Sequence, residues 1–195
     1  FKGNFNGNGA TVYGMNAQGS SYKAGFIPLV NQSYNTVVSN ISFKYSFVKM
    51  SSTADNNLHS AGVLFGDVSG DTNSQNTATV NNVEVSYAKT DDAVALHTYG
   101  GFIGTPRRML FVAENCIAKS LSDKFAGFHA TWGQYSNANT GQHQLTNCIA
   151  IDVSKGAAQY AQYSNCFTTS NSSTEGITNN SKANDFFEGT AAITN

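Results

Sequence analysis

Charged side chains are scarce in this sequence of 195 residues, because Asp, Glu, Lys and Arg together make up only 12 % of it. Soluble domains usually hold roughly 25 %. The 11 basic and 12 acidic residues give a formal net charge of −1. No excess of positive charge therefore favours nucleic acid or an anionic membrane surface as a partner. The 40 % of hydrophobic residues argues against a disordered chain.

Proline and long apolar runs are scarce too. The sequence has two prolines and no proline-rich linker, and apolar runs such as 24–30 and 109–113 are much shorter than the roughly 18 residues that span a bilayer. We therefore expect no membrane insertion and a single domain over residues 1–170, followed by a polar C-terminal tail or cap over residues 171–195. The sequence begins at Phe1, without a signal peptide, and its strand-like pattern starts at once. We therefore expect it to be a piece of a longer protein.

The three cysteines are an odd number and lack the CxxC or Cys/His spacing of a zinc site, so we expect no metal at them. Their surroundings are more informative than their number. Each cysteine follows an asparagine in a similar frame: AENCIAKS, LTNCIAID and YSNCFTTS.

The same frame occurs twice more, as VSNISFKY and VNNVEVSY, so the sequence contains an internal repeat. A glycine element precedes each frame, as in AGFIPL at 24–29, AGVLFG at 61–66, GGFIGT at 100–105 and AGFHAT at 126–131. Repeats of this length are typical of stacked architectures, in which one unit cannot bury its apolar face alone. The repeated asparagines are Asn40, Asn82, Asn115, Asn147 and Asn165.

The residues after each asparagine alternate between apolar and polar, as in a strand with one buried face. The apolar face of the first frame would hold Ile41, Phe43, Tyr45 and Phe47, and Tyr87 would continue the same face in the next repeat. The asparagines would form a hydrogen-bonded ladder in a buried bend between strands. One inward column would contain Ile41, Val83, Cys116, Cys148 and Cys166.

Two other structures compete with this interpretation. A helix is disfavoured because the repeats alternate, glycine interrupts them often and no window has a clean 3.6-residue period. An antiparallel sandwich would use similar short strands, but it gives no reason for five asparagine frames in register. The sequence therefore predicts an all-β fold, a right-handed parallel β-helix solenoid of about five coils with an asparagine ladder.

The opening FKGNFNGNGATVYGM, at residues 1–15, resembles the entry segment of secreted right-handed β-helix proteins, with Asn6 in place of the usual Asp. The elements AGFIPL and AGVLFG resemble the GLUG motif of the same group of microbial surface proteins, which are pectin-lyase-like in fold. The resemblance covers about residues 1–170. It implies a cell-surface, adhesin-like protein.

Little in the sequence points to catalysis or to a cofactor. Polysaccharide lyases and hydrolases need clustered carboxylates, whereas the acids here are scattered. Asp67, Asp71 and Asn73 lie in one turn, but without the spacing and final Glu of a calcium loop. No G-x-S-x-G elbow or dinucleotide fingerprint occurs. The four histidines also lack metal-ligand spacing: His59, His97, His129 and His143.

Two segments could bind a ligand. The polar segment 131–143 contains the only tryptophan, and an aromatic face beside amide groups suits a sugar ring. Trp132 could equally continue a packed strand. The two arginines follow Pro106 and could hold a carboxylate or sulfate of an acidic glycan, or lie in a solvated turn. The candidate ligand-binding residues, expected side by side on one lateral face, are Tyr99, Arg107, Arg108, Trp132 and Tyr135.

These observations predict a non-catalytic, extracellular module of a microbial surface protein, an adhesin or stalk that binds glycans weakly. Its partners would be neighbouring segments or copies of the same protein, and cell-surface or extracellular glycans. Two alternatives remain: a structural subunit of an extracellular fibre, and a fragment of a tailspike-like polysaccharide depolymerase.

Overall fold

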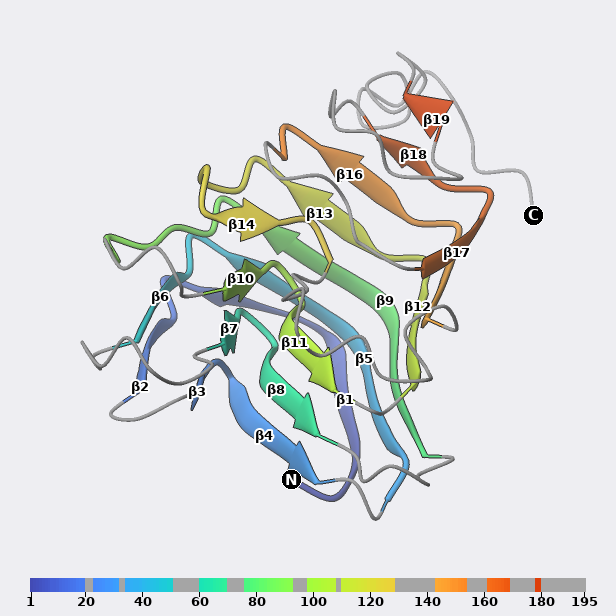
Figure 1. The fold of residues 1–195 in the computed structure, drawn as a ribbon, viewed down its shortest axis with the longest axis horizontal. Coiled ribbons are helices and arrows are strands. Elements are labelled where there is room, and N and C mark those ends of the chain that lie inside the picture. Colours follow the sequence, from blue (N-terminus) through green and yellow to red (C-terminus); the bar gives the residue numbers. More distant parts are fainter. Residues whose placement is uncertain are drawn as a thin grey trace.

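The computed structural model describes residues 1–19, 23–31, 34–50, 60–69, 76–92, 98–107, 110–128, 143–153, 161–168 and 178–179. These residues form β-strands and no helix, and every strand pairing among them is parallel (Figure 1). The prediction of an all-β fold is therefore confirmed for the described part of the chain. None of its segments is a helix long and apolar enough to cross a membrane.

The largest sheet has ten strands and is called the main sheet. Its first three strands are long and pair side by side, in the order β1, β5, β9. Later strands are shorter and come in pairs that continue β9. Its members are β1 (Gly3–Tyr13), β5 (Thr36–Lys44), β9 (Thr77–Ser86), β12 (Leu110–Glu114), β13 (Ile117–Lys119), β15 (His143–Thr146), β16 (Ile149–Ile151), β17 (Ala161–Ser164), β18 (Phe167–Thr168) and β19 (Thr178–Asn179).

Three smaller parallel sheets receive the strands between those of the main sheet. The two-stranded sheet contains β2 (Asn16–Gly19) and β6 (Phe47–Met50). The four-stranded sheet contains β3 (Lys23–Ala24), β7 (Ser60–Gly62), β10 (Thr98–Gly100) and β14 (Phe125–Ala126). The three-stranded sheet contains β4 (Ile27–Asn31), β8 (Phe65–Ser69) and β11 (Ile103–Arg107). Strands β1 to β4 visit the four sheets in this order, and β5 to β8 visit them again in the same order.

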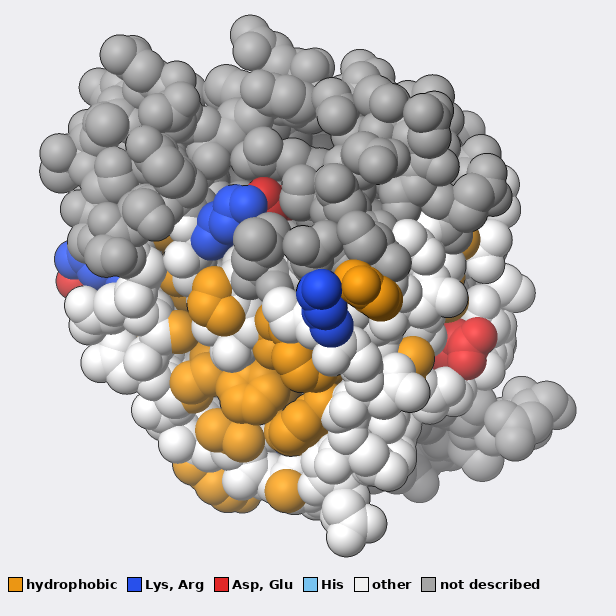
Figure 2. All heavy atoms as spheres, turned by 90° about the horizontal axis from the view of Figure 1, so that it is seen from below, with side chains coloured by type: hydrophobic (Ala, Val, Ile, Leu, Met, Phe, Trp, Pro, Cys, Tyr) orange, Lys and Arg blue, Asp and Glu red, His pale blue; other side chains and the backbone are white. Residues whose placement is uncertain are grey.

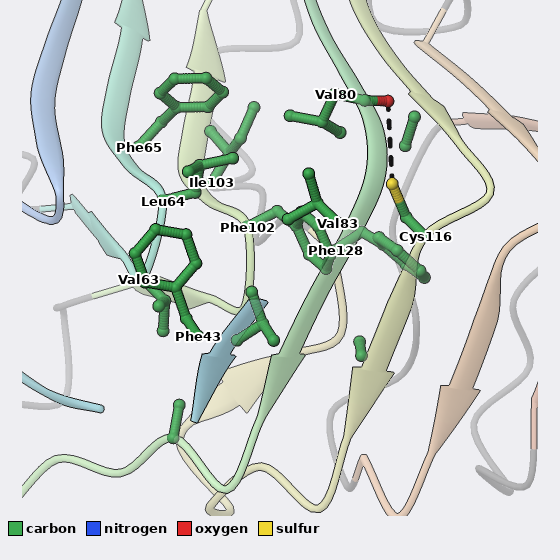
Figure 3. Packing of buried hydrophobic residues seen from close by; sticks show 14 of the residues in the cluster. Phe43, Val63, Leu64, Phe65, Val80, Val83, Phe102, Ile103, Cys116 and Phe128 are labelled. Atoms are coloured by element: carbon green, nitrogen blue, oxygen red, sulfur yellow. Dashed lines mark hydrogen bonds between the residues drawn. The ribbon is translucent and has the colours of Figure 1, made fainter. Parts of the chain in front are cut away.

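The core lies between the main sheet and the three- and four-stranded sheets. In Figure 3, Phe65 and Ile103 face Val80 and Cys116 across the interior. The expected inward column, from Ile41 through Val83 to the three cysteines, is buried throughout. Parallel sheets covered on their inner face in this way carry close-packed apolar side chains in successive layers.

The glycine elements make the sharp turn between the four-stranded and the three-stranded sheet. A Cβ atom on Gly62 would lie 2.4 Å from the carbonyl oxygen of Phe65, and one on Gly104 would lie 2.4 Å from the amide nitrogen of Ala61. No side chain fits at such distances from backbone atoms. The recurring glycines of the sequence are therefore explained by the close approach of backbone segments.

The alternation of buried and exposed residues slips by one position at two bends of each long repeat. Phe43 is buried, Tyr45 is exposed and Ser46 is buried, so the residues after Tyr45 have the opposite phase from the one expected. Tyr45 has a left-handed backbone with φ of 58°, and Tyr87 has the same value. The expectation that Tyr45 and Tyr87 point inward is therefore wrong, because a left-handed residue inverts the alternation.

One end of the molecule presents hydrophobic side chains. Figure 2 shows the molecule from below, where β1 and β4 lie in Figure 1, and hydrophobic side chains gather there among polar ones. Within the described strands, β1 pairs with β5 alone. Half-buried residues of this first repeat pack against the core: Phe5, Val12, Met15 and Ala17.

Candidate functional site

The repeated asparagines lie one above another at the first bend of the main sheet. All five have a left-handed backbone, with φ between 52° and 54°, a conformation that asparagine adopts more readily than most residues. The side-chain amide of Asn82 donates to Oδ1 of Asn40 at 2.8 Å. In the same way Asn147 donates to Asn115 at 3.2 Å and Asn165 to Asn147 at 2.8 Å.

The ladder begins one repeat earlier than expected and lies on the surface. Asn40 donates to Oδ1 of Asn6 at 3.2 Å, and Asn6 also accepts a hydrogen bond from the backbone of Asn8. The hydrogen bonds between these amides are exposed, so the expected burial of the bend is corrected. The bend turns the asparagines outward, because the inward position is taken by the residue that follows each of them. The ladder is a structural element and presents no enclosed site.

A second column of left-handed residues marks the other bend of the main sheet. The backbone amides of the first four members each donate to the carbonyl of the residue that precedes the next member, as from Tyr45 to Ser86 at 3.0 Å and from Tyr87 to Lys119 at 2.9 Å. The sequence did not reveal this column, because its members share a left-handed conformation and not a residue type. The members are Gly14, Tyr45, Tyr87, Ser120 and Asp152.

The two tyrosines of this column form an exposed aromatic stack. Their ring centroids are 4.9 Å apart and their planes differ by 10°. Tyr45 is 57 % exposed and Tyr87 is 39 % exposed. Two large aromatic rings held parallel at the surface by adjacent strands are a preformed platform, because the backbone fixes both side chains before any ligand arrives.

A cleft opens beside this stack. It has a volume of about 400 Å³ and lies along two neighbouring strand ends, with residues 87–89 on one and residues 120–122 on the other. Its floor contains the buried side chains of Ala88 and Leu121. The volume falls in the range of small-molecule sites, which combine an apolar lining with a few polar groups. The lining residues are Tyr45, Tyr87, Ala88, Lys89, Ser120, Leu121 and Ser122.

Polar groups surround the apolar floor. Lys89 is exposed and is the one charged residue among the described residues that line the cleft. On the other side, the hydroxyl of Ser120 donates to the carboxylate of Asp152, the next member of the column, at 3.3 Å. The cleft lining therefore combines the two tyrosines with the cation of Lys89, two residues after Tyr87, and the hydroxyl of Ser120, the next member of the column.

Of the predicted ligand face, the structure describes the side chain of Tyr99 alone. Tyr99 is 1 % exposed, and its hydroxyl donates to the carboxylate of Asp92 and accepts from the backbone of Met50. Burial raises the pKa of Tyr99 above its usual value, and the hydrogen bond to Asp92 raises it further. The expectation that Tyr99 lines a surface site is corrected, because its ring faces the core. Arg107 lies in β11 but its side chain is outside the described residues, as are Arg108, Trp132 and Tyr135.

The cysteine column is buried and hydrogen bonded. Cys116 donates to the carbonyl of Glu114 at 3.1 Å, Cys148 to that of Thr146 at 3.3 Å, and Cys166 to that of Leu145 at 3.2 Å. Burial raises the pKa of Cys148 well above its usual value. The pKa of Cys166 is raised by its hydrogen bond with Cys148 and by burial. The raised pKa values make the thiols of Cys148 and Cys166 poor nucleophiles.

Other residues considered for metal binding are engaged elsewhere or lie outside the described part. Asp67 is buried and pairs with Nζ of Lys23 at 2.8 Å, while Asp71 and Asn73 are not among the described residues. His143 is buried and accepts a hydrogen bond from the backbone of Phe111. Among the described residues, no three His, Cys, Asp or Glu side chains lie close enough together to hold a metal ion. His59, His97 and His129 lie outside that part of the chain.

The fold and the candidate site together define an all-β protein of parallel strands with an exposed tyrosine cleft on one flank. No family model, no curated protein and no solved structure matches the chain.

Proposed function

We propose that residues 1–170 form a right-handed parallel β-helix of about five coils. Support comes from the parallel pairing of every described strand, and from the order in which β1 to β4 and then β5 to β8 pass through the same four sheets. The asparagine ladder and the column of buried cysteines add two lines of equivalent residues along the stack. Right-handedness follows the known preference of parallel crossover connections.

The proposed role of this β-helix is a non-catalytic, extracellular module of a microbial surface protein, an adhesin or stalk that binds glycans weakly. The observation that carries the glycan part is the parallel, exposed stack of Tyr45 and Tyr87 beside a cleft. A sugar ring can lay its C–H face on an aromatic ring while its hydroxyls reach polar groups at the rim. The rigid strands would present this platform without rearrangement.

The affinity of a single module should be low. One aromatic platform contributes on the order of 1 kcal/mol beyond area burial. A dissociation constant of about 1 mM corresponds to roughly 4 kcal/mol of binding free energy, which a cleft of this size can reach. Useful adhesion then requires many copies on one surface, because linked sites raise the effective concentration.

A glycan array tests the proposal with the protein displayed as a multimer. The parent should bind at least one glycan class, and Tyr87→Ala should bind it at least tenfold less tightly while keeping its melting temperature. Tyr13→Ala is the matched control, because Tyr13 is 68 % exposed but lies outside the stack. No binding by the multimer, or equal losses in both variants, would reject the proposal. Release of reducing ends from a bound polysaccharide would favour the depolymerase instead.

The second candidate is a structural subunit of a fibre, and the hydrophobic end face in Figure 2 favours it. Apolar side chains at the end of a stack of strands can be buried by a further layer of strands from another copy. Sedimentation at increasing protein concentration separates the two roles. A fibre subunit would form long assemblies whose formation does not depend on Tyr87.

A further inference from the structure

The aromatic stack in the second bend column ends at Tyr87, because the next member of the column has no ring. Successive members are Gly14, Tyr45, Tyr87 and Ser120, so two rings are followed on each side by a residue without a ring. Equivalent backbone hydrogen bonds link each member to the next repeat, as from Tyr87 to Lys119 and from Ser120 to Ile151. The position of Ser120 is therefore where a third tyrosine would continue the stack, and the cleft lies there.

We infer that this cleft takes one pyranose ring of an acidic glycan as the third member of the stack, on the face of Tyr87 turned toward Ser120. The inference rests on the proposed glycan-binding function and specifies the ligand class and its position. Tyr45 supports Tyr87 from the opposite side at a ring separation of 4.9 Å. The small side chain of Ser120 leaves the space in which the sugar ring lies.

The polar groups of the cleft select the orientation and the charge of the sugar. Lys89, in the cleft lining, pairs with the carboxylate of a uronic acid, because its exposed ammonium group is a positive charge within reach of the ligand. On the neighbouring strand, the Ser120 hydroxyl donates to Asp152 and can accept a hydrogen bond from a sugar hydroxyl. The acidic group of the sugar then points toward Lys89.

Filling the space with a side chain tests the position. Tyr45 and Tyr87 hold the same left-handed backbone as Ser120, so tyrosine is compatible with this position, and Ser120→Tyr should complete the stack and abolish binding of a multimer to an acidic glycan. Gly14→Tyr is the matched control, because it extends the stack at the other end, where a Cβ atom meets nothing within 4 Å. It should bind within about twofold of the parent. Ser120→Ala keeps the space and loses only the hydrogen bond of the hydroxyl, so its binding should fall between that of the parent and that of Ser120→Tyr.

Melting temperatures first establish that all three variants fold. If Ser120→Tyr is folded and binds like the parent, or if Gly14→Tyr loses binding to the same extent, the inferred position is wrong although the protein binds glycans. Should Ser120→Tyr fail to fold, a uronate oligosaccharide titrated into the parent while the Tyr87 ring signals are followed by NMR decides the point. Shifts confined to residues outside the cleft would overturn the inference.

A comparison of charged and neutral sugars tests the ligand class. The parent multimer should prefer a polyuronate over its neutral, carboxyl-reduced counterpart by about tenfold, and Lys89→Gln should remove the preference. Equal binding of the two polymers by the parent would refute the acidic class. Absence of all binding by the parent would instead refute the proposed glycan-binding function itself, so the two failures are distinguishable.

Discussion

The phenol of Tyr99 donates a hydrogen bond to the carboxylate of Asp92, seven residues earlier, in the interior of the molecule. The same oxygen accepts from the backbone amide of Met50 at 3.3 Å. Tyr99 therefore joins β10 to the end of β6 and satisfies a buried carboxylate. A tyrosine that looks suited to ligand binding in the sequence serves as an internal polar link in the fold.

Removal of this hydroxyl should destabilise the protein. Tyr99→Phe leaves the ring in the core, where it packs against Phe125, but removes one hydrogen bond to Asp92 and the acceptor of the Met50 amide. A buried polar group left without its partner costs about 1–3 kcal/mol. Urea unfolding measures the difference in the free energy of unfolding. Tyr45→Phe is the control, and its stability should lie within about 0.5 kcal/mol of the parent, because Tyr45 is exposed.

Substitution in the asparagine ladder should also destabilise. Asn147→Leu removes the hydrogen bonds to Asn115 and Asn165 and places a branched side chain at φ of 52°, so we expect a loss of about 1–3 kcal/mol. Asn147→Gly removes the same amide but tolerates the backbone, and the difference between the two variants isolates the backbone strain. Thermal melting of both variants tests this. Parent-like melting of Asn147→Leu would show that the exposed ladder contributes nothing.

The burial of His143 predicts a loss of stability in acid. Burial lowers the pKa of His143 from 6.5 to about 4, so the folded protein keeps the imidazole neutral while the unfolded chain already binds a proton. The contribution of the neutral imidazole to the free energy of unfolding is complete above pH 6.5 and is lost as the pH falls from 6.5 to about 4, on the order of 3 kcal/mol in all. Urea unfolding across this range measures it. His143→Asn, which keeps an acceptor for the Phe111 amide, should show a flatter dependence.

The three thiols should react slowly in the native protein. Cys116, Cys148 and Cys166 are buried, and the raised pKa of Cys148 keeps its thiol protonated at neutral pH. A thiol reagent should label them only after denaturant is added. Rapid labelling of all three in the native state would contradict the inward column.

The sequence predicts the parts of the fold that depend on residue type. The recurrence of Asn before Ile, Val or Cys identified the first bend, because asparagine is favoured in the left-handed conformation. The glycine elements were recognised as a second repeated feature, and the structure supplies the reason, which is the close approach of backbone segments. The phase of the alternation after Phe43 was missed, because Tyr45 adopts the left-handed conformation without being a residue that favours it.

The candidate site could not be predicted in the same way. Tyr45 and Tyr87 are 42 residues apart, like Asn40 and Asn82, so their stacking follows from the repeat. Their exposure does not, because strict alternation places both in the core. The sequence shows small residues at Gly14 and Ser120. Only the structure shows that these two positions are equivalent to those of Tyr45 and Tyr87. The candidate site therefore depends on the left-handed backbone at these positions, which composition and alternation do not reveal.

The ladder amides run in one direction, with each described hydrogen bond pointing from an asparagine to the one in the preceding repeat. Asn6 accepts at the first position, so its own Nδ2 group is the outermost donor of the series. If two copies met symmetrically through their first repeats, the Asn6 amide donor of one copy would face the same donor of the other. The first repeat of one copy is therefore better suited to contact a different surface of another copy, one that presents hydrogen-bond acceptors. A fibre built from such heterologous contacts, as in the second proposed role, would have all its copies pointing along the same axis and therefore two distinguishable ends.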